Sequence, residues 1–146
     1  MSLKKNATAN WTGTGAEGKG TLSTSNKFFD NTPYSFKSRF QNEDGTLGTN
    51  PEELIAAAHA GCFTMALSFA IAQAGFVADN LNTKATVTLD EVEGGFEISG
   101  ISLFLIGSVS GMDVEKFTEL ANGAKAGCPV SKALSAVPIS LEIKFV

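Results

Sequence analysis

The sequence predicts an α+β protein whose elements follow the order βββ-α-ββ-αα-β. Two observations support this order. One long helix is expected between Asn50 and Gly75, and strands with alternating polarity stand in runs before and after it. Because strands and helices do not alternate singly, α+β is favoured over α/β. The 146 residues suit a single domain, 1–146, with a sizeable core.

The chain before the long helix is expected to form three strands. Residues 7–11 alternate between apolar and polar types, which is typical of a half-buried strand. A glycine-rich turn, 13–20, precedes a second predicted strand over 20–27. Residues 33–40 alternate again and predict a third strand, and a polar loop over 41–49 leads into the helix.

Dense local signals predict where the long helix begins and ends. Asn50 is a good N-cap, and Pro51 suits the first helical position because no N–H is needed there. Glu53 follows the N-cap by three residues, as in a capping box. Gly75 is a natural terminator.

The long helix carries no charged side chain from Leu54 to Phe76. A run of this length could cross a bilayer, but its flanks are acidic and no Lys or Arg adjoins them to set an orientation. We therefore expect no membrane span. A helix that is apolar all round must then be covered on every side by protein. A sheet of the same chain can cover one side, and a second subunit is the candidate for the rest.

The chain after the long helix returns to strands and then to helices. We expect a bulge near Gly100 in a long apolar strand and an N-cap at Asp113. The expected elements are strands over 84–90 and 96–109 joined by a turn at 93–95, a helix after Asp113, a short helix after Pro129 and a final strand over 138–146.

Charge and cysteine content restrict the possible partners and compartment. The net charge is −4 without a basic run, which argues against nucleic acid and anionic membrane as partners. Residues 1–6 carry positive charge, but no apolar segment follows, so a signal peptide is not expected. We therefore expect a cytoplasmic protein with reduced thiols. The spacing of Cys62 and Cys128 matches no local zinc pattern, and no metal is expected.

The two cysteines are the first candidates for chemistry. Cys128 lies between Gly127 and Pro129, at the N-cap of a predicted helix, where unpaired N–H groups lower a thiol pKa. Cys62, inside the long helix, is either redox-active or a small buried hydrophobe. His59 precedes Cys62 by one helical turn. Such a pair suits a Cys–His hydrolase or a histidine without chemistry.

Arg39 is the only arginine of the chain and lies on the predicted third strand. A guanidinium can hold a carboxylate together with a thiolate or peroxide oxygen in a fixed fork, which Lys cannot do. An ordinary surface residue is the alternative. Glu52 is a candidate acid near the helix start, although the helix dipole already accounts for an acid there.

Three stretches of the sequence carry a family resemblance that spans essentially the whole chain. They are Thr49–Leu54 followed by Cys62, Ala124–Ser131, and Ser38–Phe40. Together these motifs resemble the OsmC/Ohr family of organic hydroperoxide reductases. In the Ohr branch the arginine lies near the N-terminal hairpin, where this sequence has none. Arg39 therefore places the chain nearer the OsmC branch.

The resemblance implies a fold and a mechanism. The fold would be OsmC-like, with antiparallel sheets around a long buried central helix in an intertwined homodimer. Cys62 would be the peroxidatic thiolate and Cys128 the resolving thiol, with Arg39 and Glu52 activating Cys62. The substrate would be an organic hydroperoxide and the reductant a dithiol or thiol, without a cofactor. The role would be defence against oxidative and osmotic stress.

Helix geometry adds an argument for the homodimer. Glu52 and Cys62 are ten residues apart on one predicted helix, hence about 15 Å apart along its axis. A glutamate cannot act at that distance. Two such helices packed antiparallel about a twofold axis would bring Glu52 of one chain beside Cys62 of the other. Two other functions stay open, a non-catalytic protein of the same fold that binds an apolar ligand and the Cys–His hydrolase.

Overall fold

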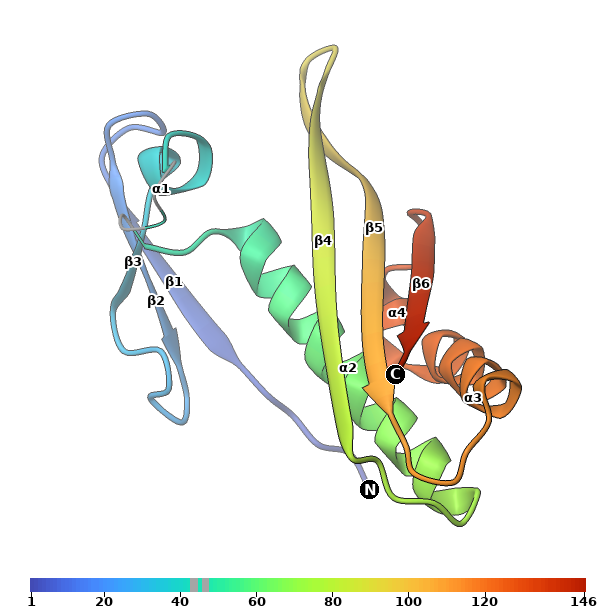
Figure 1. The fold of residues 1–146 in the computed structure, drawn as a ribbon. Helices are drawn as coiled ribbons and strands as arrows, with labels where there is room; N and C mark the ends of the chain where they lie inside the picture. Colours follow the sequence, from blue (N-terminus) through green and yellow to red (C-terminus); the bar gives the residue numbers. More distant parts are fainter. Residues whose placement is uncertain (43–44, 46–47) are drawn as a thin grey trace. The chain divides into compact units, whose positions relative to one another are not determined.

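A computed structural model describes residues 1–42, 45 and 48–146 (Figure 1). The chain forms two compact units, residues 1–54 and 55–146, and each is described by itself. The predicted polar loop over 41–49 falls partly outside the described residues.

The first unit contains an antiparallel sheet in the order β1-β2-β3. Its strands are β1 (Ala7–Thr12), β2 (Lys19–Thr24) and β3 (Thr32–Tyr34). The rings of Trp11 and Tyr34 lie 5.4 Å apart, and a Cβ at Gly20 would overlap both of them. This close approach requires glycine at position 20. All residues of β1 are exposed in the single chain, so the predicted half-burial is wrong for the chain alone.

The predicted strand over 33–40 is wrong beyond Tyr34, because a short helix, α1 (Phe36–Phe40), replaces it. Ser35 is its N-cap and forms a reciprocal capping box with Ser38, in which each side chain accepts from the backbone N–H of the other. These two bonds satisfy N–H groups that a strand would leave to a neighbour. Arg39 therefore lies on a helix and not on a strand.

Helix α2 (Pro51–Gln73) begins and ends as predicted. The backbone N–H of Glu53 donates to Asn50 Oδ1 at 2.8 Å, which is the expected N-cap bond. Gly75 follows the last turn with a positive φ of 87°, a conformation that favours glycine. The helix is long and apolar enough to cross a membrane by length and composition.

The second unit contains a sheet in the order β4-β5-β6. Strands β4 (Asn80–Val92) and β5 (Gly95–Ser108) form the predicted hairpin. Their register shifts between Thr88 and Leu89, opposite Gly100, which confirms the bulge. The third strand, β6 (Ile139–Phe145), pairs with β5 in parallel, so the prediction of antiparallel sheets is wrong for this pair.

Two helices explain the parallel pairing, because parallel neighbours need a long crossover connection. Helix α3 (Val114–Gly127) begins at the predicted N-cap Asp113, whose side chain accepts from the Lys116 N–H. Helix α4 (Pro129–Ala133) follows after a single residue. Together they return the chain to the end of the sheet where β5 begins. Strand β6 can then run beside β5 in the same direction.

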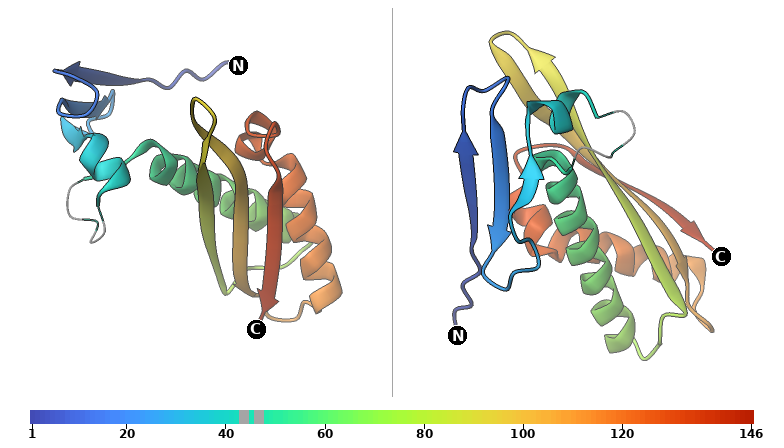
Figure 2. Two further views of the ribbon diagram at one scale, coloured as in Figure 1. Left: turned by 90° about the horizontal axis from the view of Figure 1, so that it is seen from above. Right: turned by 90° about the vertical axis from the view of Figure 1, so that its left-hand side faces the viewer.

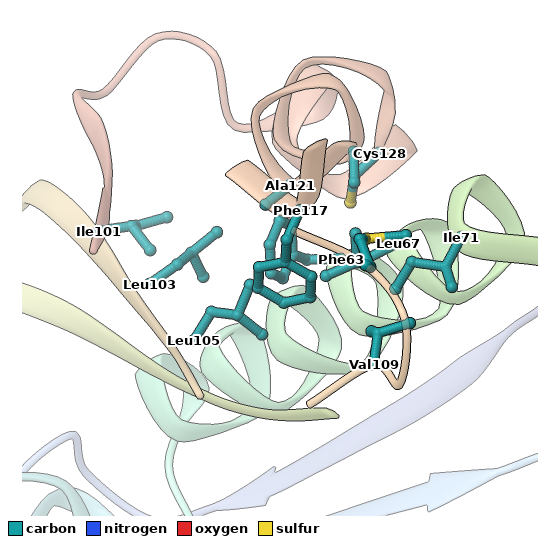
Figure 3. Packing of buried hydrophobic residues seen from close by; sticks show 12 residues of the cluster. Phe63, Leu67, Ile71, Ile101, Leu103, Leu105, Val109, Phe117, Ala121 and Cys128 are labelled. Carbon is teal, nitrogen blue, oxygen red and sulfur yellow. The ribbon is translucent and has the colours of Figure 1, made fainter. Parts of the chain in front are cut away.

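The core of the second unit lies where α2 and α3 cover one face of its sheet (Figures 2 and 3). Helix α2 contributes a buried stripe at every fourth residue, namely His59, Phe63, Leu67 and Ile71. On other sides of the helix, the Met65 and Phe69 side chains are 63% and 64% exposed. The predicted central helix is thus buried along one face in the single chain, and an apolar face stays uncovered.

Candidate functional site

The two cysteines, 66 positions apart in sequence, lie side by side in the second unit. Cys62 is on α2, and Cys128 occupies the single residue between α3 and α4. Their Sγ atoms are 2.8 Å apart and both thiols are free. Since an S–S bond measures about 2.05 Å, a small local movement closes a disulfide. This confirms the proximity that the expected pairing of a peroxidatic and a resolving thiol requires.

The backbone around Cys128 exposes its sulfur to N–H groups. Cys128 has non-helical φ and ψ of −58° and 124°, and Pro129 opens α4 directly after it. Burial raises the pKa of the Cys128 thiol, but the hydrogen bond that it shares with Cys62 and its hydrogen bonds with the backbone and hydroxyl of Ser131 outweigh that effect. The net pKa of Cys128 is therefore lowered, as the helix-terminus argument predicted.

Cys62 has the opposite electrostatic environment. Burial raises the pKa of its thiol, and the hydrogen bond that it shares with Cys128 raises it further. A nearby cation would oppose both effects, because an opposite charge favours the thiolate.

His59 is fully buried and faces Ser131 rather than a cysteine. Its Nε2 atom lies 2.7 Å from the Ser131 hydroxyl, and its Nδ1 atom has no hydrogen-bond partner among the described residues. Burial lowers the pKa of His59, which favours the neutral ring. Because Ser131 occupies the Nε2 atom, no Cys62–His59 hydrogen bond of the kind that a hydrolase needs is found.

Ser131 was missed by the sequence prediction. It is only 6% exposed and lies on α4, three residues after Cys128. The available signal was a hydroxyl residue in the first turn of a helix that begins at a cysteine, where side chains three positions apart are neighbours.

In the first unit, Arg39 and Glu52 form a bidentate ion pair. Arg39 Nε donates to Glu52 Oε2 at 3.1 Å, and Nη2 donates to Oε1 at 2.5 Å. The side chains are 34% and 12% exposed, respectively. The Arg39 guanidinium also lies over the Phe40 ring, 5.0 Å from its centroid. Two fixed contacts orient the guanidinium and leave part of it accessible.

A cavity of about 180 Å³ adjoins this ion pair within the first unit. Most of its walls are aromatic or apolar, which suits an alkyl or aryl group next to a cation. Its lining residues are Trp11, Gly15, Tyr34, Ser35, Phe36, Arg39, Phe40 and Pro51. Among the described residues, no three His, Cys, Asp or Glu side chains gather closely enough to hold a metal ion.

The fold and these side chains define the class of protein. Two thiols within reach of a disulfide, in a chain that also orients a guanidinium beside an aromatic cavity, are typical of a cysteine-based redox protein. Residues 42–144 match the family model described as OsmC-like protein. The chain belongs to this family, as the resemblance predicted.

Similar proteins cover between 70% and 95% of this chain. The peroxiredoxin OsmC of Escherichia coli strain K12 is 46% identical over 136 residues, which is 93% of each chain. The organic hydroperoxide resistance protein OhrB of Bacillus subtilis strain 168 is 38% identical over 104 residues, covering 70% of this chain and 74% of its own. A crystal structure of Bacillus subtilis OhrB aligns with a TM-score of 0.71 at 30% identity, covering 95% of this chain and 98% of that chain.

Proposed function

We propose that Cys62 and Cys128 carry out the reaction of this chain, a thiol-dependent hydroperoxide peroxidase of the OsmC family. Organic hydroperoxides are the proposed substrates, since one relative is named a peroxiredoxin and another an organic hydroperoxide resistance protein. The observation that carries the proposal is the 2.8 Å separation of the two free Sγ atoms.

The proposed reaction has three steps. The Cys62 thiolate attacks one oxygen of ROOH, the O–O bond breaks, and the alkoxide takes a proton and leaves as ROH. The Cys62 sulfenic acid is then attacked by the Cys128 sulfur, which forms the disulfide and releases water. An external dithiol or thiol reduces this disulfide and restores both thiols. No metal or organic cofactor takes part in these steps.

Arg39 is the proposed activator of Cys62. Burial raises the pKa of Cys62, so its ionisation at neutral pH needs a nearby cation. The bidentate contact with Glu52 fixes the Arg39 guanidinium, which could also stabilise charge on the departing oxygen. The aromatic cavity beside Arg39 would hold the organic group of the substrate.

We propose further that two chains form a homodimer with two active sites. Glu52 and Cys62 lie on the same helix, α2, about 15 Å apart along its axis. The exposed Met65 and Phe69 give α2 an apolar face that a second chain would cover. In an antiparallel pair of α2 helices, the Arg39–Glu52 pair of one chain would serve Cys62 of its partner.

The two compact units, 55–146 with the thiols and 1–54 with the cation, would then work as one functional domain over 1–146. A cytoplasmic location suits this chemistry, because that compartment supplies thiol reductants. It also agrees with the packing of the Phe63, Leu67 and Ile71 stripe of α2 into a protein core.

A thiol count before and after peroxide tests the proposed function. The reduced protein should lose both maleimide-reactive thiols on addition of one equivalent of an aryl or alkyl hydroperoxide. A sulfenic acid probe should label Cys62 transiently. Unchanged thiols with continued ligand binding would support the apolar-ligand-binding alternative. Thiols that stay reduced while an ester is cleaved would support the hydrolase.

A further inference from the structure

The proposed mechanism assigns no role to His59, a buried titratable residue. His59 is fully buried, one helical turn before Cys62, and its only hydrogen bond described joins Nε2 to the Ser131 hydroxyl at 2.7 Å. Burying a polar ring with an unpartnered nitrogen costs free energy of folding. The presence of His59 one turn from Cys62 therefore needs an explanation.

The surroundings of His59 select one tautomer. If Nδ1 carried the proton, a buried N–H donor would stand without an acceptor, and Nε2 would accept the Ser131 hydrogen. If Nε2 carries the proton, it donates to Ser131 Oγ, and only an acceptor lone pair at Nδ1 is unpaired. An orphaned N–H is rarer in proteins than an orphaned acceptor, which favours the Nε2–H form.

The Nε2–H tautomer makes the Ser131 hydroxyl an acceptor toward His59. A hydroxyl that accepts from His59 is free to donate its own hydrogen elsewhere. Ser131 lies three residues after Cys128 on α4, and its hydroxyl is one of the groups that lower the Cys128 pKa. The structure thus shows two contacts, His59 with Ser131 and Cys128 with Cys62, and the first turn of α4 joins them because Ser131 is three residues after Cys128.

We propose that His59 is a positioning residue for the resolving step, acting through Ser131. Its Nε2–H bond holds the Ser131 hydroxyl so that the hydroxyl hydrogen faces the Cys128 sulfur and stabilises the thiolate that attacks Cys62. This inference rests on the proposed role of Cys128 as the resolving thiol. His59 itself neither gains nor loses a proton during the reaction.

The step balances without a further reactant. The Cys128 thiol gives up its proton, and its sulfur forms the S–S bond with the sulfenic sulfur of Cys62. The S–O bond of the sulfenic acid breaks, and the hydroxide that leaves combines with the released proton to form water. Ser131 donates a hydrogen bond throughout and keeps its proton.

The first test uses Cys62→Ser protein, whose single thiol is Cys128, and follows thiolate absorbance against pH. His59→Leu and Ser131→Ala should each raise the Cys128 pKa by about one unit, a tenfold loss of thiolate below the pKa. His59→Gln, which keeps an N–H donor at the same reach, should restore most of that shift. No peroxide is used, so this result is independent of the proposed function.

The second test follows the Cys62 sulfenic acid in protein with both cysteines. His59→Leu should lengthen its lifetime about tenfold, while the rate of the first peroxide step stays unchanged. Thr64→Val is the matched control, because it removes a 2.7 Å hydrogen bond from α2 to Thr83 that involves neither cysteine. An unchanged Cys128 pKa in folded Ser131→Ala and His59→Leu, or an equal pKa shift in Thr64→Val, would overturn the proposal.

Discussion

The two compact units differ in the chemical groups that they contribute to the proposed mechanism. Residues 55–146 hold both thiols of the chain, largely shielded from water, in surroundings that raise the pKa of Cys62. Residues 1–54 hold an oriented guanidinium and an aromatic cavity but no cysteine. The second unit places two thiols within disulfide reach in its interior, and the same burial opposes the ionisation of Cys62.

The Arg39–Glu52 pair is better explained by function than by stability. With a side chain that is 34% exposed, an ion pair of this kind adds little to the free energy of folding. The pair instead orients the Arg39 guanidinium, because two of its nitrogen atoms donate hydrogen bonds to the Glu52 carboxylate. In the proposed mechanism, residues 1–54 therefore supply the cation and residues 55–146 supply the thiols.

Removal of either thiol should give the largest effect and separate their roles. Cys62→Ser should abolish peroxide consumption, because the nucleophile is lost. Cys128→Ser should still consume about one equivalent and then stall without external thiol, because the sulfenic acid has no internal partner. Single-turnover assays with an organic hydroperoxide measure both. Full turnover by Cys62→Ser would reverse the assignment.

Substitution of Arg39 should come next in size. Arg39→Ala and Arg39→Lys should each lower kcat/KM about 100-fold, since Lys keeps the charge but loses the bidentate fork. Thermal unfolding should change little in either variant, since the pair is partly exposed. Glu52→Ala should lower both the rate and the stability, because Glu52 also lies in the first turn of α2. Wild-type turnover by Arg39→Ala would remove Arg39 from the site.

A charge on the exposed face of α2 should break the proposed dimer. Met65→Glu would place a carboxylate where a partner subunit is expected, and it should yield monomers with about tenfold lower activity at micromolar concentration. Val114→Glu is the matched control, since Val114 is 55% exposed at the first position of α3, where an acid is tolerated. Sedimentation measures the mass. An active Met65→Glu monomer would contradict the dimer proposal.

The pH dependence of alkylation should show the smallest effect and report the ionisation of Cys62 directly. In Cys128→Ser protein, Cys62 is the single thiol, and its reactivity rises with its thiolate fraction. Arg39→Ala removes the cation but leaves the burial that raises the Cys62 pKa. The alkylation midpoint should therefore move to higher pH, by about one unit. A midpoint unchanged by Arg39→Ala would show that another group ionises Cys62.

Sequence signals were sufficient where local chemistry decides the structure. The N-cap of α2 at Asn50, its end at Gly75, the bulge opposite Gly100 and the N-cap Asp113 follow from single residues and their neighbours. The predicted strand over 33–40 was wrong because Phe36 and Phe40 fit a helical spacing as well as an alternating one. The Ser35–Ser38 capping box stabilises a helix at these residues instead of a strand.

Other features depend on contacts between distant segments and could not be predicted locally. The direction of β6 follows from the crossover through α3 and α4, a length that already favours a parallel pair. The cysteine pair was expected only through the family motifs, since 66 residues separate its members. The contact of His59 with Ser131 joins α2 to α4 and has no local signal.

The most direct test of the account asks whether one chain's Arg39 serves the other chain's Cys62. Inactive Cys62→Ser subunits are mixed with nearly inactive Arg39→Ala subunits, and exchange is verified by mass spectrometry. If the sites form across the subunits, each heterodimer has one intact site, and an equal mixture should recover about a quarter of the wild-type peroxidase activity. Complete exchange with no recovered activity would place Arg39 and Cys62 in the same chain's site and contradict the account.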